Sequence, residues 1–299
     1  MLTEGLIVRA QSGFFEIETD HGRVISQLRG KLKRGRRLGD AAALGDRVTL
    51  HVLEDGTGSI QQVLPRKSVL SRKAPGRERE QVIVANPDQA MFVFSGAEPD
   101  PNLHLLDRLL VVAERDEIPA VVCLNKLDLV DPSDARSVFS LYEQLGYPVL
   151  YVSAKTGKGL GELRRALAGR LSVMAGPSGV GKTTLLNRLI PGIGLRTRGV
   201  SRATGKGLHT TVVPELLLLK GGGYVADTPG LKAFELWDIE PVELDAYFRE
   251  IRPLVELCAF SDCTHLHEPG CAVQDAVARG KIDSARYESY VRMRLGEPE

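Results

Sequence analysis

Gly176-Pro-Ser-Gly-Val-Gly-Lys182-Thr183 is the stretch of this 299-residue chain that decides its fold. It fits the pattern G-x4-G-K-[ST] in full, follows the apolar run Leu171–Ala175, and precedes a helical run over Lys182–Leu189. A strand, a glycine-rich loop and a helix in this order are the context that a phosphate-binding loop requires. Backbone N–H groups of such a loop surround phosphate oxygens, and the helix N-terminus adds the positive end of its dipole. We therefore expect Lys182 to meet the β- and γ-phosphates of a nucleotide and Thr183 to bind Mg²⁺.

A second motif, Asp227-Thr-Pro-Gly230, follows an apolar run that ends at Ala226. An aspartate at the end of a strand, downstream of a phosphate loop, is the expected carboxylate on the Mg²⁺ side of the site. Gly230 can present its N–H to the γ-phosphate. The two motifs together predict a nucleoside triphosphate site.

A third motif, Asn125-Lys126-Leu127-Asp128, ends the apolar run Pro119–Leu124 and identifies the base. A carboxylate accepts two hydrogen bonds at once, and among the common bases only guanine offers adjacent N1–H and N2–H₂ donors. We therefore expect Asp128 to read guanine. Asn125 holds either the loop or the O6/N7 edge of the base, and the stem of Lys126 covers the face of the ring. Ser153-Ala154-Lys155 is the companion loop, whose backbone N–H meets guanine O6.

These motifs occur in an unusual order. In ordinary small GTPases the phosphate loop comes first, whereas here the base-reading motif and its companion loop precede the phosphate loop and Asp227–Gly230. The order predicts a circular permutation, in which the segment after Gly230 runs directly into the C-terminal region. The predicted nucleotide-binding residues are Asn125, Lys126, Asp128, Ser153, Ala154, Lys155, Gly176, Pro177, Ser178, Gly179, Val180, Gly181, Lys182, Thr183, Thr184, Asp227 and Gly230.

The hydrophobic pattern divides the chain into three domains. Residues 1–68 read as short alternating strands separated by glycine turns, which predicts a small β-barrel. A basic stretch containing Arg66 and Arg79 follows as a linker. Residues 82–235 alternate apolar runs with amphipathic stretches, which predicts an α/β core with a mainly parallel sheet. Residues 238–299 read as helices, with candidates at Pro241–Ile251, Val273–Arg279 and Ser284–Leu295.

The C-terminal region carries the pattern Cys258-x4-Cys263-x-His265-x5-Cys271. Clustered cysteine and histidine in an intracellular chain are typical of metal ligands rather than disulfides. Three thiolates and one imidazole form a closed tetrahedral set, so we expect structural zinc with no open position for catalysis. His267 is the alternative fourth ligand. The remaining cysteine, Cys123, lies in an apolar run and is expected to be a buried strand residue.

Composition and charge narrow the class of protein further. With 43% hydrophobic and 26% charged residues the chain has an ordinary globular composition, which excludes disordered, collagenous and coiled-coil proteins. No apolar run approaches the roughly 18 residues that cross a bilayer, and the N-terminus lacks the apolar stretch of a signal peptide. The net charge of +1 is asymmetric: residues 1–85 carry 15 Lys and Arg against 10 Asp and Glu (+5), and the rest carry 24 against 28 (−4).

A basic front end is typical of a segment that faces a polyanion. Its densest run, Lys31-Leu-Lys-Arg-Gly-Arg-Arg37, lies between strands of the predicted barrel, where basic loops favour nucleic-acid binding over a merely solvated loop. The candidate RNA-binding residues are Lys31, Lys33, Arg34, Arg36 and Arg37.

A small barrel, a permuted GTPase and a Cys3His region together resemble the RsgA (YjeQ/YloQ) family of bacterial GTPases that depend on the small ribosomal subunit. The resemblance covers essentially the whole chain. It implies an OB-fold at the front, binding of the 30S subunit through 16S rRNA, and hydrolysis of GTP to GDP and phosphate that the subunit stimulates during its late maturation. The implied cofactors are one structural Zn²⁺ and Mg²⁺ with GTP. We expect a cytoplasmic monomer that binds no membrane.

The family's switch I pattern falls on Gly207-Leu-His209-Thr210-Thr211-Val212. Val212 replaces a third threonine, so either Thr211, which we favour, or Thr210 binds Mg²⁺. Leu231 occupies the position where Ras-like enzymes place the glutamine that orients the attacking water. His209 is our candidate for that role, with a surface histidine of no catalytic part as the alternative. The catalytic candidates are His209, Lys182 and Thr211. Arg196, Arg198 and Arg202 either stabilise transition-state charge or contact rRNA.

Two other functions fit parts of the sequence. A GTP-dependent regulator of a protein partner would use the same permuted core, although the basic runs argue against it. A zinc-dependent nucleic-acid enzyme would need an open zinc position, which a closed Cys3His set does not provide.

Overall fold

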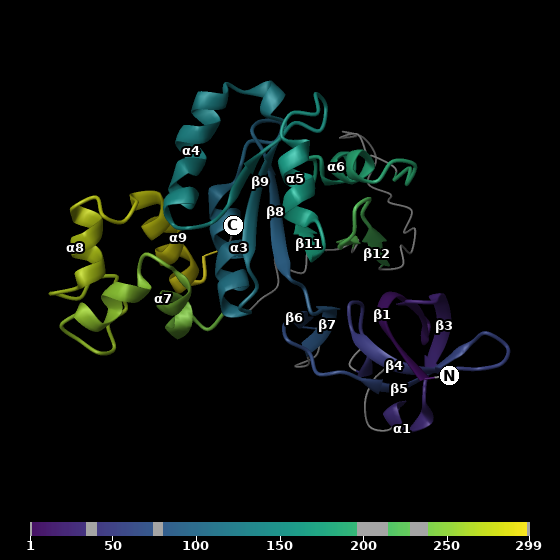
Figure 1. Ribbon diagram of the computed structural model, residues 1–299. Helices are drawn as coiled ribbons and strands as arrows, with labels where there is room; N and C mark the ends of the chain where they lie inside the picture. Colours follow the sequence, from purple (N-terminus) through teal and green to yellow (C-terminus); the bar gives the residue numbers. More distant parts are fainter. Residues whose placement is uncertain (1, 34–40, 74–79, 196–214, 228–238, 298–299) are drawn as a thin grey trace, which may run out of the picture.

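The computed structural model describes residues 2–33, 41–73, 80–195, 215–227 and 239–297. A β-barrel, a central α/β core and a group of C-terminal helices follow one another along the chain (Figure 1). In the described part, eleven strands share one sheet in the order β10-β9-β8-β11-β13-β12-β1-β2-β3-β5-β4, and β1 also pairs with β4. The first half of this order belongs to the core and the second half closes into the barrel.

The N-terminal barrel confirms the predicted small β-barrel and has the five strands of an OB-type fold. Its strands are β1 (Leu2–Gln11), β2 (Phe14–Thr19), β3 (Gly22–Leu28), β4 (Arg47–Val52) and β5 (Gly58–Val63), and the short helix α1 (Gly30–Lys33) follows β3. Strands β3 and β5 are parallel and the other pairs are antiparallel. Buried side chains such as Ile7, Ile17 and Leu50 fill the barrel.

The stretch predicted as a linker is instead partly a β-hairpin, so that prediction was wrong. Strands β6 (Val69–Lys73) and β7 (Glu80–Ala85) pair antiparallel and lie between the barrel and the core in Figure 1. Leu70 and Val84 are fully buried in the hydrophobic cluster of the core. Their burial fixes the hairpin there, although the many basic residues of the stretch had favoured a solvated segment.

The central domain confirms the predicted α/β core with a mainly parallel sheet. Strands β10, β9, β8, β11 and β13 are parallel, and β12 is antiparallel. The strands are β8 (Gln89–Ser95), β9 (Ala120–Asn125), β10 (Val149–Tyr151), β11 (Leu171–Ala175), β12 (Glu215–Leu218) and β13 (Tyr224–Asp227), and the helices are α3 (Leu103–Arg115), α4 (Pro132–Gln144), α5 (Leu160–Leu167) and α6 (Lys182–Leu189), with a 3-10 turn η1 (Leu127–Leu129).

Helices cover both faces of this sheet, which explains its continuous apolar strands. Side chains of α3 and α4 form one hydrophobic cluster with the sheet, and side chains of α5 and α6 form another on the opposite side. Every residue of β8, β9 and β11 is consequently buried. Because these strands are parallel, their carboxyl ends meet at one edge, and the loops that carry the three motifs begin there.

The C-terminal region is helical, as predicted, but its first helix is shorter than Pro241–Ile251. A 3-10 turn η3 (Pro241–Glu243) leads into a single helical turn α7 (Leu244–Tyr247), and η4 (Arg252–Leu257), α8 (Ala272–Ala278) and α9 (Ser284–Leu295) follow. The helix ends at Phe248, whose backbone is extended. Phe248 is fully buried and meets Tyr290 edge to face, at 5.5 Å between ring centroids. Tertiary packing of this ring therefore overrides helix continuation.

Two arginines, the buried Arg286 and the partly exposed Arg249, attach the C-terminal helices to the core. Arg286 of α9 is 1% exposed and lies 2.6 Å from Asp107 of α3 and 2.7 Å from Glu250. Asp107 also accepts a hydrogen bond of 2.8 Å from the Tyr142 hydroxyl of α4. Arg249 donates to Glu114 at 2.7 Å. Since each charge is paired, the two domains are held in one arrangement.

None of the described helices is long and apolar enough to cross a membrane.

Arg286→Ala should destabilise the chain by about 3–5 kcal/mol, because it leaves two carboxylates buried without their partner. Urea denaturation followed by circular dichroism measures the loss. Arg279→Ala is the matched control, since Arg279 is 65% exposed and its pair with Asp275 should contribute less than about 1 kcal/mol. Equal effects of the two variants would contradict the assigned role of Arg286.

Candidate nucleotide site and metal centre

The phosphate loop connects β11 to α6, as the sequence predicts, and two glycines are required by its path. Gly176 has a φ of +143°, and a Cβ there would lie 2.0 Å from the Val93 carbonyl oxygen. Gly181 has a φ of +94°, and a Cβ there would lie 2.4 Å from Asn125 Nδ2. The Lys182 ammonium donates to the carbonyls of Gly176 at 2.6 Å and Pro177 at 2.7 Å. The charge of Lys182 therefore lies over the loop that would surround the phosphates.

Asn125 ties the phosphate loop to the base-reading loops. Its Nδ2 donates to the Val180 carbonyl at 2.9 Å, and its Oδ1 accepts from the Ala154 N–H at 3.0 Å. The side chain is at the end of β9 and is 1% exposed. Of the two roles that the sequence left open for Asn125, the structure shows the one in which it holds the loops.

Asp128 lies beside the companion loop with its carboxylate oriented. Its Oδ1 accepts from the Ser153 hydroxyl at 2.5 Å, and its Oδ2 is 3.7 Å from the Lys155 ammonium. The Ser153 hydrogen bond, helped by the Lys155 charge, lowers the pKa of Asp128 below the ordinary aspartate value. The carboxylate therefore stays ionised at neutral pH and can accept two N–H donors. The Lys126 ammonium donates to the Glu98 carbonyl, which holds its stem against the loop between β8 and α3.

The remaining predicted nucleotide residues are only partly described. Ser178, Gly179 and Val180 lie in the phosphate loop, and Thr183 and Thr184 begin α6. The Asp227 backbone ends β13, where the sequence places it, and pairs with Glu215 of β12. The other residues predicted for the phosphate side of the site lie outside the described residues. They are Arg196, Arg198, Arg202, His209, Thr210, Thr211, Val212, Gly230 and Leu231.

The sequence motifs did not point to Arg188, which the structure places at the companion loop. Arg188 is on α6, and its guanidinium donates to the carbonyls of Ala154 and Lys155 at 2.8 Å each. The sequence shows only that Arg188 lies on the helix that begins at Lys182. Its distance from Lys182 along the chain does not reveal which loop the Arg188 side chain reaches.

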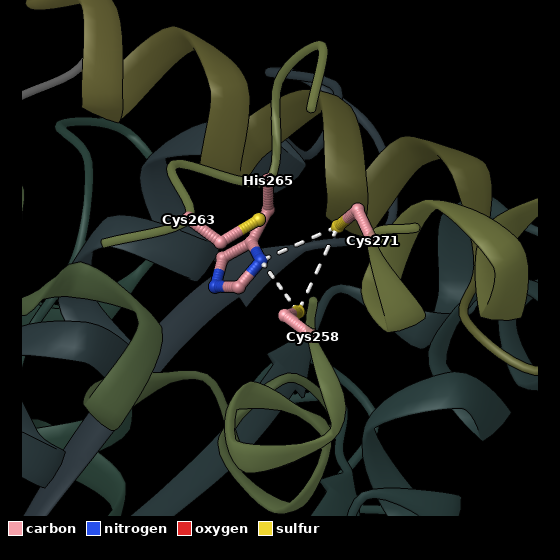
Figure 2. Close-up of side chains that lie close together, drawn as sticks. All are labelled: Cys258, Cys263, His265 and Cys271. Carbon is pink, nitrogen blue, oxygen red and sulfur yellow. Dashed lines mark hydrogen bonds between the residues drawn. The ribbon is translucent and has the colours of Figure 1, made fainter. Parts of the chain in front are cut away.

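Cys258, Cys263, His265 and Cys271 come together as the sequence predicts (Figure 2). All four lie in the segment between η4 and α8, where Cys258 caps the end of η4 and Cys271 caps the start of α8. Their ligand atoms all lie within 4.8 Å of one another. His265 Nδ1 is 3.5 Å from Cys258 Sγ and 3.4 Å from Cys271 Sγ. His265 is fully buried, whereas His267 is exposed, so the structure selects His265 as the fourth donor.

The surroundings of this cluster fit a metal ion bound through His265 Nδ1. The other ring nitrogen, Nε2, is buried without a hydrogen bond in the described residues and faces Asp245 Oδ2 at 3.5 Å. A carboxylate behind a ligating histidine is a usual feature of metal sites, since it fixes the ring. Four donors with three sulfurs match the closed set of structural zinc.

Glu268 organises the loop that carries Cys263 and His265. Its carboxylate accepts backbone N–H bonds from Thr264 at 2.8 Å, Leu266 at 3.1 Å and His267 at 3.2 Å. Partial burial opposes ionisation, but these bonds and one from the Thr264 hydroxyl together lower the pKa of Glu268. The fourth cysteine, Cys123, is confirmed as a buried strand residue, and burial raises the pKa of its thiol to about 12.

The barrel surface is described in part. The backbones of Lys31 and Lys33 lie in α1, and Arg34, Arg36 and Arg37 lie outside the described residues. Phe14 of β2 is 50% exposed and Ile25 of β3 is 57% exposed. They line a hollow of about 460 Å³ together with Arg9, Gln11, Ser12 and Glu16.

Cys258→Ser should lower the bound metal per chain and destabilise the C-terminal helices before it changes the nucleotide site, because a structural metal contributes directly to folding. Metal analysis of purified protein and limited proteolysis of the C-terminal region provide the measurements. His267→Ala should keep full metal content, since His267 is exposed and is not one of the four grouped donors. Loss of metal from the His267→Ala variant would instead indicate that His267 is the fourth ligand.

Asp128→Asn should weaken guanine nucleotide binding about tenfold or more, since an amide presents a donor where guanine also presents one. Xanthine nucleotides, which carry a carbonyl in place of N2–H₂, should gain relative to guanine ones. Competition binding with GDP and xanthosine diphosphate measures the switch. Asp134→Asn, at an exposed position of α4, should leave the preference unchanged.

Comparison with known proteins places the chain in a family. The RsgA GTPase model matches residues 63–237, and the RsgA N-terminal domain model matches residues 4–60. A "Small ribosomal subunit biogenesis GTPase RsgA" of Gemmatimonas aurantiaca is 45% identical, with 98% of this chain and 96% of that protein covered. The crystal structure of YjeQ from Thermotoga maritima has a TM-score of 0.82 at 39% identity, covering 99% and 98% of the two chains. That of YloQ, titled a circularly permuted GTPase, has a TM-score of 0.79 at 30% identity, covering 100% and 97%. With its permuted core, this chain belongs to the RsgA GTPase family and is a GTP-hydrolysing enzyme.

Proposed function

We propose that this GTPase binds the small (30S) ribosomal subunit, acts in its late maturation in the cytoplasm, and hydrolyses GTP to GDP and phosphate faster when the subunit is bound. The observation that carries the nucleotide part is the Asn125 side chain, which joins the phosphate loop to the base-reading loops. The name of the relatives, small ribosomal subunit biogenesis GTPase, supports the ribosomal part.

Within the site, each proposed role follows from the chemistry of the side chain. The Asp128 carboxylate accepts from guanine N1–H and N2–H₂, and Lys182 contacts the β- and γ-phosphates. Thr183 and Thr211 would hold Mg²⁺, with Asp227 on the same side. When bound, Mg²⁺ neutralises charge on the phosphate oxygens. Binding therefore positions the γ-phosphate between the phosphate loop and the Asp227–Gly230 segment.

Hydrolysis by the chain alone should be slow. Leu231 has no group that can orient water, although this position carries the water-orienting glutamine in Ras-like enzymes. His209 can accept or donate a hydrogen bond, and we assign it the positioning of the attacking water. Subunit binding would increase turnover by holding His209 in place.

The barrel would supply the contact with 16S rRNA. Its basic run at residues 31–37 can neutralise phosphates, which gives a salt-dependent affinity. The half-exposed Phe14 ring, next to Arg9 in the hollow of the barrel, can stack on an unpaired base. The C-terminal Cys3His cluster would hold one structural Zn²⁺ and maintain the shape of that domain.

GTP hydrolysis should be slow for the purified monomer and at least about tenfold faster with 30S subunits, as positioning in other GTPases contributes factors of this size or larger.

His209→Ala should reduce the stimulated rate and leave GTP affinity near normal. A phosphate-release assay with and without subunits, over a range of salt, measures both.

Lys182→Ala, which should weaken nucleotide binding or turnover in either condition, is the reference for loss of the phosphate site. Stimulation by a protein partner and none by 30S would reject the ribosomal role. Normal subunit-stimulated turnover by the His209→Ala variant would reject the proposed role of His209 in positioning the attacking water.

A further inference from the structure

The companion loop, residues 153–158, has one backbone donor left for a ligand. Among the described residues, the Ser153 N–H donates to the Lys158 carbonyl at 2.9 Å and the Ala154 N–H to Asn125 Oδ1 at 3.0 Å. The N–H groups of Thr156 and Gly157 donate to Ser153, at 3.1 Å to its Oγ and at 2.8 Å to its carbonyl, and the Lys158 N–H donates to Thr156 Oγ1 at 3.4 Å. The Lys155 N–H has no acceptor in that part of the chain. It is therefore the N–H of this loop that is available for a base.

Arg188 holds the peptide groups on both sides of Lys155. Its Nε donates to the Ala154 carbonyl and its Nη2 to the Lys155 carbonyl, both at 2.8 Å. Arg188 comes from α6, the helix that begins at Lys182 of the phosphate loop. A planar guanidinium that donates two parallel bonds fixes the orientation of what it holds.

Because Arg188 fixes the Ala154 and Lys155 carbonyls, it also fixes the orientation of the Lys155 N–H. In a trans peptide the C=O of one residue and the N–H of the next point in opposite directions. The Ala154 carbonyl points to Arg188, so the Lys155 N–H points away from α6. The neighbouring peptide cannot rotate to compensate, because its carbonyl is bonded to Arg188 and its Thr156 N–H to Ser153 Oγ.

We infer that Arg188 is a positioning residue for guanine recognition, which aims the Lys155 N–H at the O6 atom of the base. The inference rests on the proposed guanine site, in which Asp128 reads N1–H and N2–H₂. Within the companion loop it specifies Lys155 as the residue whose N–H meets O6, and it connects that N–H to the phosphate-loop helix through Arg188. A base with an amino group at C6 would place a donor against the Lys155 N–H.

Arg188→Ala should weaken GDP binding about three- to tenfold, the range expected when one hydrogen bond to the base loses its alignment. The affinity for 6-thio-GDP should fall less than about twofold, because this analogue keeps N1–H and N2–H₂ and replaces O6 with sulfur, a weaker acceptor. Titration calorimetry with both nucleotides on the full chain gives the two ratios. Arg188→Lys, which keeps the charge without the bidentate geometry, should give an intermediate loss for GDP.

Arg165→Ala is the matched control for loss of charge. Arg165 is exposed on α5 and its side chain makes no hydrogen bond or ion pair with another described residue, so both affinities should stay unchanged. Equal losses for GDP and 6-thio-GDP in Arg188→Ala, or no loss for GDP, would overturn the inference. A wild-type chain that binds GDP no better than ADP would instead reject the proposed guanine site itself.

Discussion

The carboxamide of Asn125 is the interaction on which the nucleotide site depends. Its nitrogen binds the phosphate loop and its oxygen binds the companion loop, so one buried side chain holds together three loops that follow three different strands. An amide suits this position because it is donor and acceptor at once, whereas an aspartate would oppose one of the two backbone groups. Gly181 is required at the same point, since a Cβ would collide with this amide. The order of the motifs along the chain can therefore change while their geometry is maintained by contact.

The circular permutation places a domain at each side of the core, and each is attached by buried contacts. Strand β1 belongs to both the barrel and the core: Ile7 packs into the barrel and Val8 into the core cluster, and the ladder to β2 shifts register between Ile7 and Arg9. Arg66 binds the fully buried Asp46 at 2.7 Å and secures the chain where it leaves the barrel. On the other side, Arg286 and Arg249 bind the helices of the core. Both added domains are thus packed against the core, and the nucleotide site lies at the carboxyl edge of the core sheet.

Local patterns predicted most of the fold and of the site, and long-range packing accounts for what they missed. Glycine spacing and strand ends located the phosphate loop, the base-reading loop and the Cys3His donors, because these features need particular residues at fixed separations. The basic residues around β6 and β7 predict a linker, because a charge pattern does not reveal the burial of Leu70 and Val84. The helix expected over Pro241–Ile251 ends at Phe248, whose ring packs against Tyr290 in the C-terminal hydrophobic cluster. Arg188 was missed because a helix position does not show which loop a long side chain will reach.

These attachments limit how the nucleotide state can reach the C-terminal domain. The segment that follows Asp227 leads to Ile239, and Ile239 packs against both the core cluster and the C-terminal cluster. Both flanks of the segment are therefore anchored in packed structure. A free swing of the C-terminal helices would have to separate the buried Arg286–Asp107 pair and expose Val111 of α3 together with the C-terminal cluster that packs against it. We therefore expect a change at Asp227–Gly230 to act on the surface around Ile239, while the metal centre stays fixed relative to α3.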